Sequence, residues 1–364
     1  MASKSFNVGV IGYGLSAKVF HIPFIATTPQ LRLHSIVQRS PRDGNSAPQD
    51  HPSAKHYTDA KQLLSDGEVD VVVVTTPPDT HFALTKAALE AGKHVLTEKP
   101  FVPTAAEAEQ LMAAARQSGR LVCVYQNRRW DADFLLVRHL VASGAVGRVV
   151  ELDSHFDRYR AAPPPAGGWK GELGTPSGGG ALFDLGAHLL NQAYVLFGMP
   201  RAVHGRLLSQ RAARPDLLSP DAVCAELAYP DAKLVHVRIS ALSAETEQPR
   251  FWLRGAAGSF RKRGLDPQED QLKAGVKPTA AGFGREDPGR MRLVRVADDG
   301  AIREEKVPDL EPETYRAFYA AFARALETGR EEDLPVKASE ARDVLRIIEA
   351  VVESAKTGRD VVFS

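Results

Sequence analysis

The first third of the chain alternates short apolar runs with stretches of helical periodicity. Apolar runs of this kind are typical of strands buried on both faces. Their alternation with amphipathic helices predicts a doubly wound parallel sheet, which binds ligands at the carboxyl ends of its strands. The expected strands are 6–11, 31–37, 69–74, 94–97 and 121–125, and the expected helices are 19–25, 59–65, 80–91 and 104–118.

Beyond residue 125 the pattern changes to successive strands with few helices between them. Such a run predicts an α+β domain with a large, mostly antiparallel open sheet. We therefore expect an α/β protein with two domains, 1–125 and 126–364, and leave open whether the last helices pack back on the first domain. The expected strands are 149–155, 202–209, 222–228, 234–241, 251–254, 259–263 and 291–297, and the expected helices are 132–143, 313–327, 338–357 and one that begins at 184.

The composition of the chain indicates which classes of binding partner and which cellular compartment to expect. The chain has 364 residues, with 46 basic against 45 acidic side chains and a net charge of +1, so we expect neither a nucleic-acid nor a membrane-surface partner. Its two cysteines, Cys123 and Cys224, cannot form a disulfide framework or a cysteine-based zinc cluster. The apolar runs are too short to cross a bilayer, and residues 1–5 lead directly into a strand without a signal-peptide pattern. We expect a cytoplasmic protein.

A glycine-rich turn follows the first strand. Gly12-Tyr13-Gly14-Leu15-Ser16-Ala17 has the form G-x-G-x-x-A, between a strand and a helix. Gly12 is expected to make the tight turn, Gly14 to leave room for a pyrophosphate, and Ala17 to let the helix pack closely. The helix N-terminus would then present its N–H groups to the phosphates. The series of strands and helices around this motif predicts a Rossmann dinucleotide-binding domain over residues 1–125.

The end of the second strand bears on which dinucleotide is bound. A site specific for NAD usually has an acidic residue there, which binds the ribose 2′-hydroxyl. Here Arg39, Ser40 and Arg42 occupy this stretch, and no carboxylate occurs before Asp43. Arginine and hydroxyl donors suit a 2′-phosphate, so we expect NADP rather than NAD. The alternative is a solvated basic loop.

Two further groups of residues could carry chemistry. Lys99, in Glu98-Lys99-Pro100, follows a strand of the parallel sheet and could stabilise a developing alkoxide near a nicotinamide; the alternative is an ordinary surface lysine. Asp184 and His188 are four residues apart, so one helix face would hold a proton-transferring histidine and the carboxylate that orients it. The alternatives are a helix-start aspartate with a structural histidine, or a metal site, for which no third ligand at a fixed spacing is evident.

The order of these motifs resembles a known family. Gly12-Tyr13-Gly14, Thr76-Pro77-Pro78-Asp79-Thr80-His81, Glu98-Lys99-Pro100, Gly144-x-x-Gly147-Arg148-Val149 and Asp184-x-x-x-His188 recur in the glucose–fructose oxidoreductase, inositol dehydrogenase and rhizopine-catabolism (Gfo/Idh/MocA) family. The likeness covers nearly the whole chain. Gly14 to His21, Tyr125 to Asp131, Leu253 to Gly255 and Gly264 to Glu269 are similar to the branch of NADP-dependent scyllo-inositol dehydrogenases.

The resemblance implies roles for individual residues. Lys99 would contact the nicotinamide ribose and the reacting hydroxyl, and Asp184 and His188 would orient the substrate and transfer the proton. Phe156, Arg158 and Tyr159 would lie near the substrate, and no metal is implied. The residues expected to contact the cofactor are Gly12, Tyr13, Gly14, Leu15, Ala17, Arg39, Ser40, Arg42, Thr75, Thr76, Pro77, His81, Glu98, Lys99 and Asn127.

We expect an NADP-dependent oxidoreductase that transfers a hydride between nicotinamide and a secondary alcohol or carbonyl of a cyclic polyol or sugar. The alternatives are a dinucleotide-binding regulator without catalysis and a reductase of a non-sugar carbonyl or imine. The resemblance also implies a homodimer, or a dimer of dimers, that hides an apolar face of the second sheet. The strand 234–239 mixes apolar and basic residues, which suit either a core or that interface.

Overall fold

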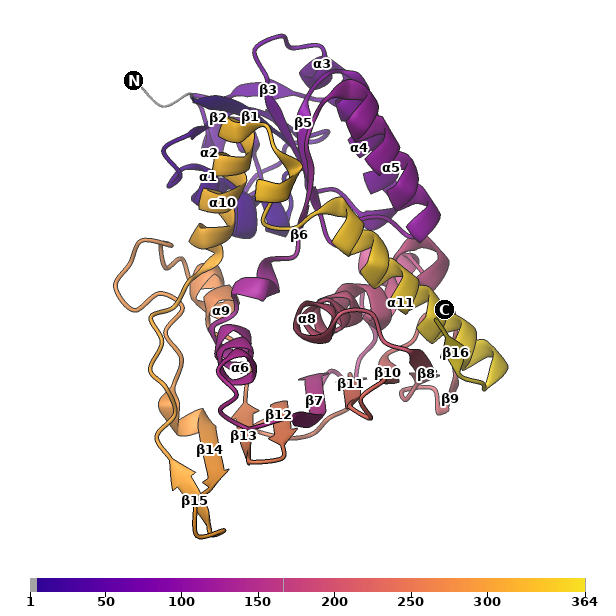
Figure 1. Cartoon of the computed structure of the whole chain (residues 1–364). Coiled ribbons are helices and arrows are strands. Elements are labelled where there is room, and N and C mark those ends of the chain that lie inside the picture. The colour runs from indigo at the N-terminus through magenta and orange to yellow at the C-terminus, as the bar shows by residue number, and fades with distance from the viewer. Residues whose placement is uncertain (1–4, 166, 364) are drawn as a thin grey trace. The chain divides into compact units, whose positions relative to one another are not determined.

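The structure, a computed structural model, describes residues 5–165 and 167–363 (Figure 1). Residues 1–4, on which the expectation of no signal peptide partly rested, lie outside the described residues. The chain forms two compact units. The first unit is made of Met1–Asn127, Gln268–Phe283 and Thr314–Arg342, and the second of Arg128–Pro267, Gly284–Glu313 and Asp343–Ser364. The expected boundary after residue 125 stays a prediction.

The first unit contains a six-stranded sheet in the order β3-β2-β1-β4-β5-β6, with every pair parallel. Val71–Val74, the whole of β4, is buried, as a strand covered on both faces requires. The strand order reverses between β1 and β4, where doubly wound sheets bind dinucleotides. The strands are β1 (Phe6–Ile11), β2 (Leu31–Val37), β3 (Lys55–Tyr57), β4 (Val71–Val74), β5 (His94–Glu98) and β6 (Val122–Tyr125). The predicted Rossmann fold is confirmed.

Helices cover both faces of this sheet (Figure 1). On one face α4 (His81–Glu90) packs beside α5 (Ala105–Ser118), and α3 (Ala60–Leu64) contacts α4. The N-terminus of α5 has the predicted capping box between Thr104 and Glu107. On the other face α1 (Ile22–Ile25), which continues a π-helical turn over Ala17–His21, contacts α10 (Tyr315–Thr328). The short helices α2 (Ala47–Asp50) and α9 (Gln268–Lys273) also belong to this unit.

Helix α10 fills an aromatic cluster in the first unit. Tyr319 stacks on Phe24 with ring centroids 5.7 Å apart, and Phe318 meets the edge of Tyr125 at 4.8 Å. All four rings are almost completely buried. Residues almost 300 positions apart therefore share one core, and the first unit is closed by a segment from the last seventh of the chain.

The second unit contains a large mixed sheet in the order β15-β14-β13-β12-β7-β11-β10-β8-β16, with β9 paired to β8. The pair β7–β11 is parallel and the other pairs are antiparallel, which confirms the predicted mostly antiparallel sheet. Helix α8 (Ala187–Phe197) packs on β7 and β11, and α6 (Ala132–Ala142) packs on α8. The strands are β7 (Val149–Asp157), β8 (Ala202–Ser209), β9 (Arg214–Pro215), β10 (Ala222–Ala228), β11 (Leu234–Ser240), β12 (Pro249–Gly255), β13 (Gly258–Arg263), β14 (Met291–Val296), β15 (Ile302–Glu305) and β16 (Val361–Val362).

The strand β11 shows how the two faces of this sheet differ. Val235, Val237 and Ile239 are buried, whereas His236 and Arg238 alternate with them on the opposite face. The apolar residues of this strand therefore serve the core of the unit. The face opposite to the core carries charged side chains of β7 and β11 and Glu226 of β10, and the expected assembly through this sheet stays a prediction.

Several elements differ from the sequence-based expectation. The helix expected to begin at Asp184 is preceded by a π-helical turn over Leu182–Gly186, and the long loop 161–180 contains the short helix α7 (Trp169–Glu172). Helix α11 (Ala338–Thr357) has the predicted bounds. Among the described residues, no helix is both long enough and apolar enough to cross a membrane.

Candidate functional site

The glycine-rich turn after β1 has the geometry that close approach of a phosphate requires. Gly12 has φ +102°, and a Cβ there would lie 2.9 Å from the Thr75 Oγ1, so only glycine fits without strain. A Cβ at Gly14 would meet nothing within 4 Å, so this side of the turn is open. Ala17 is fully buried, as the close helix–strand packing predicts, whereas Leu15 is exposed.

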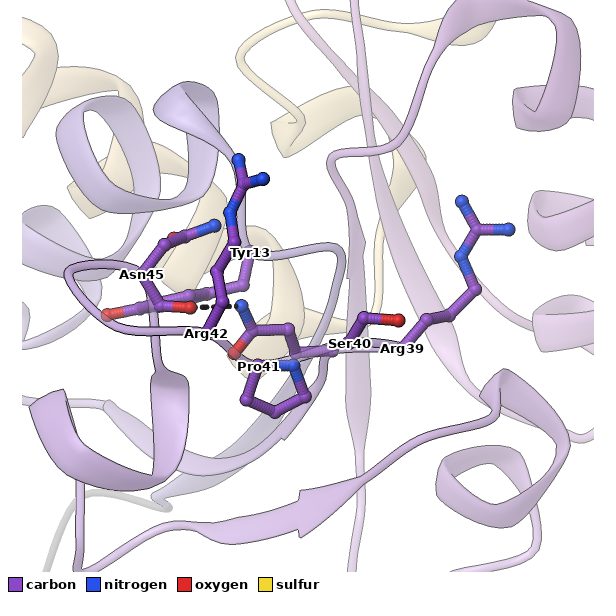
Figure 2. Close-up of a pocket in the computed structure, with 7 residues that line it drawn as sticks. Tyr13, Arg39, Ser40, Pro41, Arg42 and Asn45 are labelled. Atoms are coloured by element: carbon purple, nitrogen blue, oxygen red, sulfur yellow. Dashed lines mark hydrogen bonds between the residues drawn. The ribbon is translucent and has the colours of Figure 1, made fainter.

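The loop after β2 lines a hollow of about 480 Å³ (Figure 2). Arg39, Ser40 and Arg42 of this loop are among the residues that line the hollow, and the Arg39 and Arg42 side chains extend to different sides of the loop. Gln38 fixes the loop: its Nε2 donates to the Asn45 carbonyl at 2.8 Å, and its Oε1 accepts from the Ala47 N–H at 2.7 Å. Such a donor set fits an anionic group such as a 2′-phosphate.

Tyr13 forms one wall of this pocket, and residues outside the motif hold its ring. The Tyr13 hydroxyl donates to the Asp50 carboxylate at 2.7 Å. The Lys18 ammonium lies 3.6 Å from the same carboxylate and 4.6 Å from the centre of the Tyr13 ring. Burial, followed by the bond to Asp50, raises the pKa of Tyr13, so the phenol keeps its proton. Asp50 was not predicted as part of the site, because nothing in its sequence neighbourhood pairs it with Tyr13.

The end of β4 is tied to its neighbours through main-chain atoms. The Thr75 hydroxyl donates to the carbonyls of Ile11 and Gly12 at 3.0 and 3.1 Å. The Thr76 and Thr80 hydroxyls are 2.6 Å apart, and the Thr80 hydroxyl also donates to the Pro77 carbonyl at 2.7 Å. These residues therefore lie at the carboxyl edge of the sheet, beside the glycine-rich turn.

His81 connects two loops of this edge. Its ring nitrogens lie 2.8 Å from the carbonyls of Thr76 and Pro100, and the ring is almost fully buried. Burial lowers the pKa of His81, and the two carbonyl contacts oppose that shift. The position of His81 indicates that it holds the backbone next to β4 and β5; its expected contact with a cofactor stays a prediction.

The end of β5 carries Glu98 and Lys99, followed by a cis Lys99–Pro100 peptide. Glu98 is buried, and its carboxylate accepts hydrogen bonds from Ser16, His21 and the Lys99 N–H. Asn127, also buried, follows β6 at the same edge. The candidate residues of the first unit therefore gather at the carboxyl ends of β1, β2, β4, β5 and β6.

In the second unit, Asp184 lies in the π-helical turn and His188 in the first turn of α8. His188 is buried, and the Asp184 carboxylate accepts a hydrogen bond from the Lys170 ammonium at 2.8 Å. Lys170 comes from α7, within the long loop that was expected to line a site. Sequence reasoning did not select Lys170. Lys99 belongs to the first unit, so the expected set of three catalytic residues stays a prediction.

The residues expected near the substrate at the end of β7 have different environments. Phe156 is 1% exposed, and the guanidinium groups of Arg128 and Arg158 lie over its ring at 5.0 and 4.7 Å. Tyr159 is 62% exposed. Phe156 is thus a packing surface for two arginines, and of the three only Arg158 and Tyr159 have polar groups that could reach a ligand.

Among the described residues, two clusters bring histidine and carboxylate atoms that could bind a metal ion within 4.8 Å of one another. Neither cluster contains Asp184 or His188. In one, His34 with Asp66 and Glu68, the Lys55 ammonium bonds both carboxylates and takes the place of a cation. The other, Glu151 with Asp153 and His236, lies on the outer face of the second sheet.

Comparison with known proteins shows similarity along almost the whole chain. A family model of oxidoreductases with an NAD-binding Rossmann fold matches residues 6–126, and that of the C-terminal alpha/beta domain of the same oxidoreductase family matches 138–363. The chain is 41% identical over 355 residues to YdgJ, an uncharacterised oxidoreductase of Escherichia coli (strain K12), covering 97% of each chain. It is 34% identical over 361 residues to the scyllo-inositol 2-dehydrogenase (NADP(+)) IolW of Bacillus subtilis (strain 168), covering 98% of this chain and 96% of IolW. The solved structure of the yvaA protein of Bacillus subtilis superposes with a TM-score of 0.88 at 32% identity, covering 99% of this chain and 100% of that one.

Proposed function

Because the chain belongs to the Gfo/Idh/MocA oxidoreductase family, we propose that it is an NADP-dependent dehydrogenase or reductase of a cyclic polyol or sugar. The observation that carries the choice of NADP is the pocket after β2, where Arg39, Ser40 and Arg42 present cationic and hydroxyl donors. The similarity to IolW, a scyllo-inositol 2-dehydrogenase (NADP(+)), supports both the cofactor and the substrate class.

In this proposal, different residues bind different parts of the dinucleotide. Arg39, Ser40 and Arg42 hold the 2′-phosphate, and the ring of Tyr13 lines the same pocket. The turn from Gly12 to Ala17 receives the pyrophosphate, because its backbone is open at Gly14 and its N–H groups favour anions. Bound there, NADP would supply the hydride acceptor or donor, at C4 of its nicotinamide.

The reacting carbon–oxygen pair is served by three side chains in this proposal. The Lys99 ammonium donates a hydrogen bond to the reacting oxygen and stabilises its developing negative charge. In the oxidative direction the His188 imidazole takes the hydroxyl proton as the carbon loses its hydride, and in reduction it returns that proton. Asp184 accepts a hydrogen bond from a neighbouring hydroxyl of the substrate, and Lys170 holds its carboxylate in place.

The first test measures cofactor choice. Calorimetric titration is expected to show tighter binding of NADP⁺ than of NAD⁺, with the difference lost in Arg39→Ala, because a charge-assisted bond to phosphate contributes roughly 1.5–3 kcal/mol. Arg116→Ala, which removes an exposed arginine of α5, is the matched control and should keep the preference. Equal or tighter binding of NAD⁺ to the wild type would contradict the 2′-phosphate site.

The same preparations then test catalysis on a panel of polyols and sugars with NADP⁺ and of carbonyl compounds with NADPH. Lys99→Ala should lose turnover while its cofactor affinity stays within a few-fold of the wild type. Tight cofactor binding without turnover of any member of the panel would favour a regulator, and turnover of non-sugar carbonyls or imines alone would replace the substrate class.

A further inference from the structure

A buried chain of hydrogen bonds connects three distant parts of the first unit. The Tyr319 hydroxyl on α10 lies 2.6 Å from Nδ1 of His21, and Nε2 of His21 lies 3.0 Å from Oε1 of Glu98. His21 has no exposed surface, Tyr319 has none, and Glu98 is 8% exposed. Tyr319 and Glu98, which are 298 and 77 residues from His21 in sequence, are thus connected through its imidazole.

The partners of His21 assign the protons along this chain. Glu98 can only accept when ionised, so Nε2 of His21 donates to it. The Tyr319 hydroxyl, 2.6 Å from Nδ1, is the partner of the other ring nitrogen, so both nitrogens of the buried imidazole are hydrogen-bonded. Burial raises the pKa of Tyr319 far above its ordinary value, so its hydroxyl stays a donor. The Tyr125 ring, whose centroid is 4.3 Å from that of His21, packs against the imidazole.

Glu98 remains a carboxylate in spite of its burial. Burial alone would raise its pKa, but the hydrogen bond from His21, together with the charge of Lys99 and the bond from Ser16, holds the pKa of Glu98 below its ordinary value. A buried carboxylate is stabilised in this way only when its oxygens accept several hydrogen bonds. The chain from Tyr319 supplies one of them.

The two oxygens of Glu98 reach both halves of the candidate nucleotide site. Oε1 accepts from the Ser16 hydroxyl of the glycine-rich turn as well as from His21. Oε2 accepts from the backbone N–H of Lys99 at 2.9 Å. Both oxygens are therefore directed at protein donors, although Glu98 was expected to contact the cofactor.

We propose that Glu98 is a positioning residue that joins the glycine-rich turn to the backbone of Lys99, and that His21 and Tyr319 fix its carboxylate for this purpose. The importance of the positioning rests on the proposed function, in which Lys99 serves the reacting oxygen. The hydrogen-bonded arrangement itself can be tested without a substrate.

The test measures hydrogen exchange of the Lys99 backbone amide by NMR in the whole protein. Tyr319→Phe removes the hydrogen-bond partner of His21 Nδ1, so the imidazole and the Glu98 carboxylate that it contacts hold the Lys99 N–H less firmly. Exchange at Lys99 should therefore become roughly tenfold faster, which corresponds to about 1.4 kcal/mol. Glu98→Gln should accelerate it similarly, because the charged acceptor is lost.

Tyr57→Phe is the matched control, because it removes another tyrosine hydroxyl of the first unit, one that donates to Asp66. It should leave the Lys99 rate unchanged, and the Val95 and Leu96 amides of β5 should keep their rates in every variant. A Lys99 rate in Tyr319→Phe equal to that in Tyr57→Phe would overturn the proposal. So would a general acceleration along β5, which indicates loosening of the sheet rather than loss of positioning.

The NADPH dissociation constant of Glu98→Gln distinguishes a positioning role of Glu98 from a direct contact with the cofactor. Glu98→Gln should keep its NADPH dissociation constant within about threefold of the wild type, because the carboxylate faces protein donors. A loss of roughly a hundredfold would show Glu98 to be a direct cofactor contact and contradict the proposal. If the exchange rates change as expected but the substrate panel gives no turnover, the positioning chain stands and the proposed function fails.

Discussion

At the scale of single residues, the two glycines of the turn have different physical roles. Gly12 is required by its backbone, since φ is +102° and a side chain would press on Thr75. No atom of the chain lies within 4 Å of a Cβ at Gly14, so the demand for glycine there comes from what approaches the turn. Stability and ligand binding should therefore respond differently at the two positions.

Gly12→Ala should lower the free energy of unfolding by about 1–3 kcal/mol, the usual cost of a side chain in a strained conformation. Gly14→Ala should change it by less than about 0.5 kcal/mol, yet weaken NADPH binding at least tenfold, because the new methyl occupies the space of the pyrophosphate. Urea denaturation and calorimetric titration of both variants measure these effects. Full NADPH affinity in Gly14→Ala would contradict the placement of the pyrophosphate at this turn.

At the scale of elements, the sequence was most informative where periodicity is strong. The strands 31–37, 202–209 and 222–228 and the helix 338–357 have the predicted bounds. The helices and strands that were not predicted are short: β3, α2, α7, β9, β15 and β16 have two to four residues, and α9 has six. Such short elements carry little periodic apolar signal, and β15 is fully exposed.

The candidate site was only partly predictable for a related reason. The glycine motif and Arg39 follow from local sequence, because strand ends and turns fix what lies at the sheet edge. The contact of Asp50 with Tyr13 spans 37 residues and that of Tyr319 with His21 spans 298, so both depend on tertiary packing. The π-helical turn at Asp184 was not predicted, because the sequence was interpreted with the period of an α-helix.

Glu286 lies near two acidic residues at the start of α6, Asp131 and Asp133, and these charges should make the stability of the second unit depend on pH. The Glu286 carboxylate lies 3.0 Å from the Lys262 ammonium of β13. Burial and the nearby charges of Asp133 and Asp131 nevertheless raise the pKa of Glu286 to about 7. Since the folded-state pKa lies above the unfolded one, the stabilising contribution of Glu286 is complete below its ordinary pKa and is lost as pH rises through about 7.

The free energy of unfolding is therefore expected to fall between pH 5 and pH 8, and Glu286→Gln should flatten this slope, because the amide does not titrate. Urea denaturation at the two pH values measures the difference. Glu304→Gln, which removes an exposed carboxylate of β15, should leave the slope unchanged. An equal slope in Glu286→Gln and the wild type would show that another group controls the titration.

At the scale of the whole molecule, we propose that the charged outer face of the second sheet joins two copies of the chain. Glu151, Asp153 and Glu226 lie on β7 and β10, while Arg261 and Arg292 lie on β13 and β14. Within one chain Glu151 and Glu226 pair with Arg254 and His236, and Arg292 pairs with Glu304. The same charges can pair between two copies across a two-fold axis, which is the commonest symmetry of homo-oligomers.

Sedimentation equilibrium should give a mass of at least twice the 39.5 kDa of one chain, and raising the salt concentration should weaken the association because the contact is ionic. Arg261→Glu should shift the equilibrium toward the single chain, whereas Lys306→Glu, outside the sheet strands, should not. A mass of 39.5 kDa for the wild type at micromolar concentration would contradict assembly.

The aromatic cluster closed by α10 cannot form completely until most of the chain has been synthesised. Phe24 and Tyr125 are synthesised early, but their partners Phe318 and Tyr319 follow almost 200 residues after Tyr125. At about 5–20 residues per second, the nascent first unit keeps this apolar face uncovered for roughly 10–40 s. Transiently exposed apolar surface is prone to aggregation, so we expect the nascent chain to depend on protection of this face until α10 has been synthesised.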